Sequence, residues 1–592
     1  MAALGLLFLG GTLASWTAEK KKVTVSVTCA SASVGDCTYE HKEVRGYTAR
    51  AVYDLQPREK AGFANLIVSS NIGSDSCGQQ DLETTYFAAG YAEGIATAQD
   101  IHDFSCNVIP DDVEQHTDLI NFIKENDEYV RTRISDIDES SEDSEYWKEV
   151  SLAYKRFDGI FEGYKEAVDL NMKGAACSED CYSEKLTMLK FLLVNLDGDL
   201  FDLMSKFSNE AIFTELGRHG RVQASLNMFK SRLPATTTIF PNGLRCSALF
   251  KVADDDIFFA HDTWDTYSTA APRIFKHVQL PTQKCFLRTT SYSSSPGFLS
   301  SIDDYYVVKE EGENEGGGSS FVVIETSNNI YSKSAYDACV PQSVFSFARA
   351  TVANNLASTA PEWARLFATN ASGTYNNQWM ILDLNLYHKN NEKLVGDCFW
   401  VLEEVPGAIE MQDQTQKLLE DGYWGSYNVA YYQKTRLVAG ETDLYGDNIR
   451  ANIFREEQGN VTDIASMQKL MALNRNAAHP GWAINARFDL YESQPDDAGG
   501  IDSKVSSAMN IAQDMITYAR GGPTHDDVSK FCWSDNEDLA RETPHCSHPQ
   551  CFNYDWATFS PGSSAVSPSL YVETDKERVT RRHRRGFPTL QR

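Results

Sequence analysis

The sequence has few basic residues for its length and no long apolar run beyond its N-terminus. Lys and Arg total 54 against 83 Asp and Glu, so the formal net charge is −29. A surface this acidic repels phosphate backbones, which argues against nucleic-acid binding along the chain. After the N-terminal segment no stretch reaches about 18 uninterrupted apolar residues, and so no membrane-spanning helix is expected.

Several hydrolase and nucleotide-binding motifs are also missing. The chain has no Gly-x-Ser-x-Gly, no His-Glu-x-x-His and no Walker loop. These absences argue against an α/β-hydrolase lipase, a zinc protease or an NTPase, although a serine triad built from distant residues stays open. No internal repeat is found at a period of about 20–50 residues.

What remains is an ordinary globular composition. Of the 592 residues, 42% are hydrophobic and 23% are charged, which is enough apolar material for a large core. The length allows about two to four domains, or one large α/β domain with insertions.

The N-terminus and the cysteines predict entry into the secretory pathway. Residues 1–18 have the pattern of a signal peptide, an apolar core too short to span a bilayer followed by small residues. The alternative is a frayed hydrophobic N-terminus. Thirteen cysteines suit an oxidising compartment, and an odd count leaves at least one unpaired within the chain. Sequons at Asn370 and Asn460 agree with a lysosomal or secreted glycoprotein.

Two cysteine clusters have alternative interpretations. Cys177 and Cys181 are four residues apart in a helical region, and His545, Cys546, His548 and Cys551 together resemble half of a metal site. Because thiols are oxidised in a secreted protein, disulfides are the favoured interpretation of both clusters.

The hydrophobic periodicity divides the chain into a helical part and a strand-rich part. Alternation at 23–28 and the apolar run 63–70 predict strands, and the pattern is helical from about 84 to 232. One long amphipathic helix is predicted from Trp147 to Val168. From about 235 onward short strands are predicted at 247–252, 257–260, 321–325, 380–386 and 398–403, with a loop over 310–320.

The C-terminal end, 577–592, is rich in arginine. This basic tail is expected to be disordered, and the alternative is a contact with acidic lipid headgroups.

A predicted hairpin contains the residues most suggestive of chemistry. Three consecutive aspartates at 254–256 separate two apolar runs, as a turn between paired strands would. If the turn is centred on Asp255, Cys246 faces Trp264 to within one register step. A thiol at the start of a strand would then lie beside His261, Asp262 and Asp265.

Cys246 can be interpreted in two ways. Among thirteen cysteines it is most simply a disulfide partner. If the chain were instead cut before Cys246, the freed α-amine would belong to the same residue as the thiol. An α-amine has a reference pKa of about 7.7–8.0, close to what a general base needs.

A series of short motifs runs along the chain, each weak alone. These are Ala88-Ala-Gly-Tyr-Ala-Glu-Gly94, Cys246-Ser-Ala248, His261-Asp-Thr-Trp264, Ser372-Gly-Thr-Tyr-Asn-Asn-Gln-Trp-Met380, Leu402-Glu-Glu-Val-Pro-Gly407, Gly425-Ser-Tyr-Asn-Val429, Arg450-Ala-Asn-Ile-Phe454 and Gly499-Gly-Ile-Asp-Ser-Lys504. By the order and number of these motifs, from about residue 46 to about 535, the chain resembles the phospholipase B-like family, also called the lamina ancestor family, within the N-terminal nucleophile hydrolases.

The resemblance implies an α+β fold and self-processing. The fold would be an αββα sandwich, two stacked antiparallel sheets flanked by helices, with a large helical insertion in the N-terminal part. The precursor would cleave itself between Arg245 and Cys246. The fragments 19–245 and 246–592 would remain associated, and a homodimer is an open alternative.

The resemblance also implies roles for the residues around Cys246. Cys246 would be the nucleophile and its α-amine the base. An acidic group would lie near that amine, with Asp265 the first candidate and Asp262 the second. Members of the family often have Asn at both positions, so this departure leaves the partner of the amine open.

Further candidates come from the other motifs. His261 and Trp264 are expected to line the pocket, and Thr326 to add a polar contact. Asn377 is the candidate oxyanion-hole donor, because an amide N–H donates to developing charge without titrating; the alternative is a turn-capping amide. Arg450 would hold the cluster or an anionic headgroup, or form a structural ion pair.

The implied reaction is acyl transfer to water. A phospholipase B-like enzyme would remove fatty acyl chains from glycerophospholipids without a metal or organic cofactor. The alternatives are an amidase acting on N-acyl lipids or small acyl-amides, and a lysosomal or secreted lipid-binding protein with a vestigial site.

Overall fold

The computed structural model describes residues 21–71, 77–110, 113–207, 246–310, 318–474, 482–490 and 495–562. The expected signal peptide 1–18, the basic tail 577–592, most of the loop 310–320 and Arg245 lie outside the described residues.

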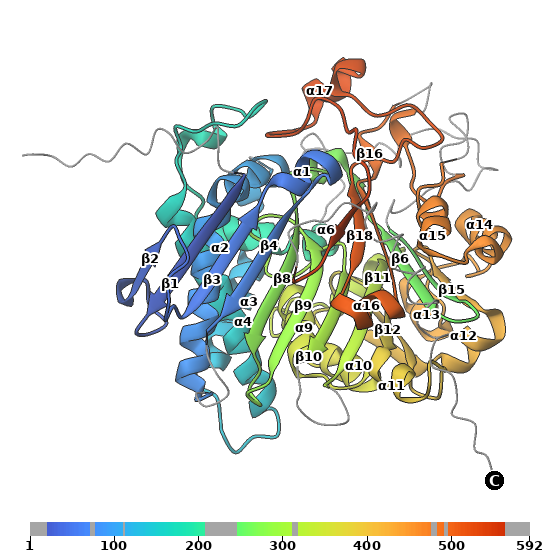
Figure 1. Cartoon of the computed structure of the whole chain (residues 1–592), viewed down its shortest axis with the longest axis horizontal. Coiled ribbons are helices and arrows are strands. Elements are labelled where there is room, and N and C mark those ends of the chain that lie inside the picture. Colours follow the sequence, from blue (N-terminus) through green and yellow to red (C-terminus); the bar gives the residue numbers. More distant parts are fainter. Residues whose placement is uncertain are drawn as a thin grey trace, which may run out of the picture.

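The larger of two stacked sheets has eleven strands and combines both halves of the chain. Its order is β14 (Ala408–Asp413), β13 (Phe399–Val405), β12 (Asn377–Asp383), β11 (Ser320–Ser327), β10 (Tyr305–Glu310), β9 (Leu287–Ser294), β8 (Arg273–Pro281), β4 (Phe63–Ser70), β3 (Ala49–Asp54), β1 (Lys22–Cys29) and β2 (Cys37–Glu40). In Figure 1 the blue N-terminal strands lie beside the green strand β8.

One neighbouring pair in this sheet departs from the expected antiparallel arrangement. β4 and β8 run parallel, with Phe63 opposite Arg273. Parallel neighbours need a long crossover, and here the N-terminal helices lie between the two strands in sequence. The expectation of purely antiparallel sheets is therefore wrong at this pair.

The second sheet has six antiparallel strands and contains the predicted hairpin. Its order is β15 (Tyr423–Ser426), β5 (Ser247–Val252), β6 (Ile257–Asp262), β17 (Asp502–Ser507), β18 (Thr517–Gly521) and β19 (Ala557–Phe559). A small two-stranded sheet pairs β7 (Trp264–Thr266) with β16 (Ala498–Gly500).

The helices fall into an N-terminal group and a C-terminal group. The N-terminal group is α1 (Gln56–Ala61), α2 (Gln79–Val108), α3 (Thr117–Ser135), α4 (Ser144–Ala167), α5 (Met188–Asn195) and α6 (Asp197–Phe207). The C-terminal group is α9 (Ser346–Leu356), α10 (Ala360–Ala368), α11 (Leu384–Lys389), α12 (Thr415–Asp421), α13 (Gln433–Ala439), α14 (Ile449–Glu457), α15 (Ile464–Met471), α16 (Ala508–Asp514) and α17 (Glu537–Glu542).

The elements form four layers, in the order helices, large sheet, small sheet, helices. Three apolar cores lie between successive layers. The first joins the large sheet to α2 and α10 and includes Leu66, Tyr86 and Trp363. The second lies between the sheets, where Phe250 and Phe259 meet side chains of β10, β11 and β12. The third joins the outer face of the small sheet to α14 and α15. This α+β arrangement is compatible with the expected sandwich (Figure 1).

Most predicted elements are present, and one strand is shorter than expected. The long helix is α4, with Val168 as its C-cap. The strand predicted over 380–386 ends at Asp383, where α11 begins. Asp383 terminates it because its carboxylate accepts the backbone N–H of Leu386 at 2.7 Å, which is an N-cap contact.

Five disulfides confirm the oxidised interpretation of the cysteine clusters. The pairs are Cys29–Cys37, Cys77–Cys285, Cys106–Cys181, Cys177–Cys546 and Cys532–Cys551. Three buried cysteines remain free, at 246, 339 and 398. Within the described ranges, no helix is both long and apolar enough to cross a membrane.

Candidate active site

The hairpin that carries Cys246 forms as predicted, one register step from the expected pairing. Ser247 lies opposite Asp262, and Ala248 lies opposite His261. Continuing this register places Cys246 level with Thr263, where the sequence predicted Trp264 to within one step. Because side chains alternate along a strand, Cys246 and Ala248 point to the same face, between the two sheets.

Arg450 fixes the start of this strand. Its guanidinium donates to the carbonyl oxygen of Cys246 at 2.7 Å and to the hydroxyl of Ser247 at 3.1 Å. It also binds the backbone oxygen of Tyr427 and lies 4.4 Å from the centre of the Trp264 ring. Burial lowers the pKa of Arg450 to about 9. Arg450 therefore holds the backbone around the thiol in place through hydrogen bonds.

The free thiol of Cys246 lies in a cluster with an imidazole and a carboxylate. Its sulfur, a ring nitrogen of His261 and a carboxylate oxygen of Glu325 all lie within 4.8 Å of one another. Glu325 comes from the end of β11 in the facing sheet. All three side chains are buried, so the cluster is shielded from water.

Burial keeps the thiol and the imidazole uncharged. It raises the pKa of Cys246 well above the usual thiol value, and the neighbouring charge of Glu325 raises it further. It also lowers the pKa of His261 well below the usual imidazole value, with Lys504 adding to the effect. The resting pair is therefore a neutral thiol beside a neutral imidazole.

Beneath this pair is a buried network of charges. Arg273 contacts Asp303 and also donates to Asp502 at 2.6 Å, and Lys504 lies 3.2 Å from Asp303. Although burial opposes ionisation, the two cations hold the pKa of Asp303 well below its usual value. Lys504 is also the register partner of His261. The network therefore joins β17, the strand that pairs with β6, to β8 of the larger sheet.

Asn377 is a buried amide on the first residue of β12. Neither its amide nitrogen nor its oxygen has a hydrogen-bond partner among the described residues. Asn377 pairs with Ser327, and Trp379 pairs with Glu325. Asn377 and Glu325 are therefore diagonal neighbours on one face of the sheet.

Thr326 and the two candidate aspartates have other partners. The hydroxyl of Thr326 lies 2.6 Å from that of Ser426, which pairs with Ala248. Asp262 contacts Ser503 on the opposite face of β6 from His261. Asp265 is half-buried on β7 and accepts the backbone N–H of Thr266 at 2.7 Å.

The structure thus brings four predicted residues together, Cys246, His261, Trp264 and Arg450. Neither aspartate belongs to the cluster of thiol, imidazole and carboxylate. Sequence reasoning missed Glu325, whose signal is a lone carboxylate directly after the apolar run 321–324. Of the two sequons, Asn460 is exposed, whereas Asn370 is half-buried and the hydroxyl of Ser372 is buried against Arg349.

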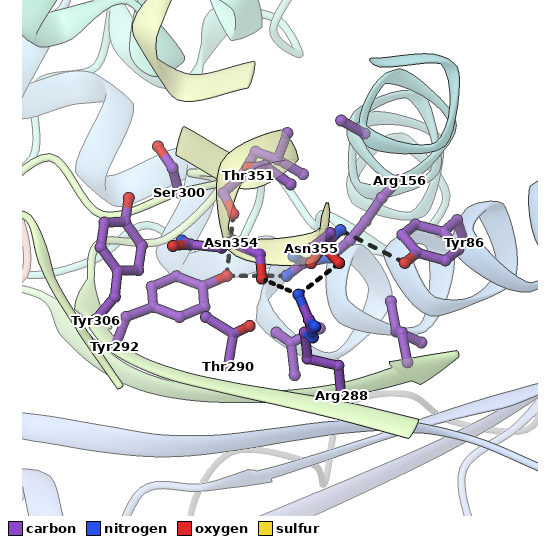
Figure 2. Close-up of a pocket in the computed structure, with 14 residues that line it drawn as sticks. Tyr86, Arg156, Arg288, Thr290, Tyr292, Ser300, Tyr306, Thr351, Asn354 and Asn355 are labelled. Carbon is purple, nitrogen blue, oxygen red and sulfur yellow. Dashed lines mark hydrogen bonds between the residues drawn. The ribbon is translucent and has the colours of Figure 1, made fainter. Parts of the chain in front are cut away.

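A small cavity that Cys246 does not line lies between the large sheet, α4 and α9 (Figure 2). Its volume is about 30 Å³, enough for about two water molecules. Arg288 donates to the backbone oxygens of Asn354 and Asn355, and Arg156 donates to Tyr292. At this size and with these internal bonds, the cavity suits structural water better than a substrate.

Comparison with known proteins finds a family match over most of the chain. A family model described as Phospholipase B matches residues 49–559. Phospholipase B-like 1 from Rattus norvegicus is 31% identical over 526 residues, covering 85% of this chain and 84% of that protein. Phospholipase B-like protein B from Dictyostelium discoideum is 30% identical over 546 residues, with 87% and 88% covered.

A third relative is called Phospholipase-B 81 and comes from Drysdalia coronoides. It is 28% identical over 578 residues, covering 94% of this chain and 96% of its own. The family match over residues 49–559 includes the strands that hold the thiol, the imidazole and the carboxylate. This chain belongs to the phospholipase B family.

Proposed function

We propose that this protein is an acyl hydrolase that removes fatty acyl chains from glycerophospholipids through an N-terminal cysteine. The main observation behind this proposal is the free thiol of Cys246, which lies between the sheets beside His261 and Glu325. Membership of the phospholipase B family and the names of its relatives support an ester substrate. The proposed fold is that of the N-terminal nucleophile hydrolases.

Self-cleavage frees the α-amine that the Cys246 nucleophile uses as its base. The Cys246 thiol attacks the carbonyl carbon of Arg245, the C–N bond breaks, and the nitrogen takes the thiol proton to become an amine. Water then hydrolyses the resulting thioester, which regenerates the thiol. Arg450 supports this geometry because it holds the carbonyl of Cys246 and so limits movement of the strand start.

The freed α-amine then serves as general base. It takes the thiol proton as sulfur attacks the ester carbonyl, and it returns that proton to the departing alcohol of the glycerophospholipid. Water attacks the thioester in the second half of the reaction, and the fatty acid is released. Asn377 donates to the oxyanion in both halves, a role supported by its unpartnered amide.

The two fragments, 19–245 and 246–592, stay together after cleavage. This part of the proposal is supported by the parallel pairing of β4 with β8 and by two disulfides that join the fragments, Cys77–Cys285 and Cys177–Cys546. In the same proposal the protein is lysosomal or secreted, carries glycan at the exposed Asn460 and forms the site without a cofactor.

The test is hydrolysis of glycerophospholipid vesicles by purified wild-type protein beside Cys246→Ala, with N-acyl-amide substrates assayed in parallel. Fatty acid release by the wild type and not by the variant supports the proposal. Release from amides alone would replace the ester substrate by an amide. A fully cleaved wild type that hydrolyses neither substrate class would overturn the enzymatic proposal in favour of lipid binding.

A further inference from the structure

Three different metal-binding groups meet at the candidate active site. Cys246 offers a sulfur, His261 a ring nitrogen and Glu325 a carboxylate oxygen, and these atoms lie within 4.8 Å of one another. The Cys246 side chain belongs to a residue only 5% exposed, and His261 and Glu325 are fully buried. Thiolate, imidazole and carboxylate are the protein ligands that Zn²⁺ prefers.

The state of the sulfur atoms distinguishes this cluster from two others of similar composition. The clusters His102–Cys106–Cys181 and Asp103–Cys177–Cys546 also bring such atoms together, but their sulfurs are held in disulfides. The sulfur of Cys246 is free. Among these three clusters in the described part of the chain, only that of Cys246 has a sulfur able to ligate an ion.

His261 provides a second and independent observation. Its imidazole is fully buried, and neither ring nitrogen makes a hydrogen bond of normal geometry to a described residue, although the backbone of Glu325 lies close enough to oppose the fall in its pKa. Histidine ring nitrogens buried without partners are costly, and they become favourable when one of them binds a ligand. One ring nitrogen lies within 4.8 Å of both the free sulfur and a carboxylate oxygen of Glu325, and so the geometry favours a shared ion.

We propose that Cys246, His261 and Glu325 form a binding site for one zinc ion, which blocks the nucleophile. On binding, the thiol proton is released to solvent and the thiolate coordinates Zn²⁺, with no change in oxidation state. The site itself needs only these three side chains. Its inhibitory consequence rests on the proposed function, because a coordinated thiolate cannot attack an acyl carbonyl.

Self-cleavage would strengthen the site. The freed α-amine of Cys246 would supply a fourth ligand and close a chelate ring with the sulfur of the same residue. Cleaved protein should therefore bind zinc more tightly than the uncleaved precursor, and zinc should slow hydrolysis.

The experiment uses Co²⁺ as a spectroscopic probe on the purified full chain. A thiolate-to-cobalt charge-transfer band that saturates at one ion per chain is expected for the wild type and not for Cys246→Ala. His261→Gln should weaken binding by at least about tenfold, as loss of a metal-supporting group commonly does. The matched control is His277→Gln. His277 is also fully buried, and its ring forms a hydrogen bond with the hydroxyl of Ser291 at 2.8 Å. This variant should bind cobalt as the wild type does.

A second measurement needs no variant. Zn²⁺ should protect Cys246 from alkylation, scored residue by residue by mass spectrometry, while the free thiols of Cys339 and Cys398 serve as internal controls. Absence of a stoichiometric band, a band that persists in Cys246→Ala, or unchanged alkylation of Cys246 would each overturn the metal site. If the protein hydrolyses phospholipid and zinc does not slow that hydrolysis, the zinc proposal is overturned and the proposed function stands. If the protein binds cobalt but hydrolyses no substrate, the proposed function is overturned and the metal site stands.

Discussion

Asn376 and Asn377 are adjacent, equally buried and differently bonded. The amide of Asn376 donates to Asp202 and to the backbone oxygen of Gly373, both at 3.0 Å. The amide of Asn377 donates to no described residue. At the residue scale this contrast separates a hydrogen-bonded amide from an unpartnered one, and only the unpartnered one is proposed to contact a reaction intermediate.

The two asparagines should therefore respond differently to truncation. Asn377→Ala is expected to lower kcat by about 10²–10³-fold with little change in Tm, because it removes an oxyanion donor and no internal hydrogen bond. Asn376→Ala is expected to cost about 1–3 kcal/mol of stability, because it leaves buried partners unsatisfied. Steady-state kinetics and thermal unfolding measure both. Full activity in Asn377→Ala would contradict its assignment.

Site residues that are close together in the sequence could be predicted as a group, and those that are far apart could not. Cys246 and His261 were predicted together because one short hairpin joins them, so local patterning fixes their pairing to within a step. Glu325 and Arg273 reach the site from other strands of the larger sheet. Their approach depends on how two sheets stack, which no local pattern specifies.

At the element scale, the motif 88–94 is explained by helix packing. Gly90 and Gly94 on α2 face the backbone of α4, where Gly159 and Gly163 face α2 in return. A Cβ atom added at Gly90 would lie 2.1 Å from the backbone oxygen of Arg156. The glycines thus let the two helix backbones come into contact.

Gly90→Ala should destabilise the protein despite the better helix propensity of alanine. The propensity gain is about 1 kcal/mol, whereas overpacking against a neighbouring backbone costs about 1–3 kcal/mol or more. Gly459→Ala is the control, because nothing lies within 4 Å of a Cβ added there. Denaturant unfolding compares them. Equal stability of the two variants would refute the packing role.

Helices and strands with a clear hydrophobic periodicity were predicted well from the sequence. Strand pairings that depend on contacts between distant parts of the chain were not. β4 and α4 agree with the sequence pattern to within three residues because their apolar periods are clear. The parallel pairing of β4 with β8 was missed, since register between segments about 200 residues apart is set by tertiary packing.

At the scale of the whole molecule, disulfides cross the proposed cleavage point. Cys77–Cys285 and Cys177–Cys546 each join the part before Cys246 to the part after it. Cleaved protein should migrate as one species of full mass on a non-reducing gel and as two fragments after reduction. Cys246→Ala should give one species under both conditions. Fragments that separate without reductant would contradict these links.

Two buried carboxyl groups, Asp199 and Asp304, each favour the folded state more in acid than at neutral pH. Burial raises the pKa of Asp199 to about 6, and it also raises the pKa of Asp304. A raised carboxyl pKa stabilises the fold fully below the unfolded value near 4, and that stability is lost as pH rises through the folded value. For Asp199 the loss approaches about 3 kcal/mol.

Thermal unfolding at about pH 4.5 and about pH 7.5 tests this linkage. Asp199→Asn, which mimics the protonated carboxyl, should raise Tm relative to the wild type more at the higher pH than at the lower pH, because only at the higher pH is the buried Asp199 ionised. The hydroxyls of Ser346 and Thr374, which donate to Asp199 at 2.6 Å, remain in place in that variant. A Tm difference between Asp199→Asn and the wild type that is the same at both pH values would refute the linkage.

N-terminal sequencing with intact mass measurement tests the central claim most directly. Wild-type protein should yield a new N-terminus at Cys246, and Cys246→Ala should not. Cys339→Ala removes another buried free thiol and should be cleaved as the wild type is. A wild-type chain that stays intact through prolonged incubation at lysosomal pH would contradict the nucleophile mechanism.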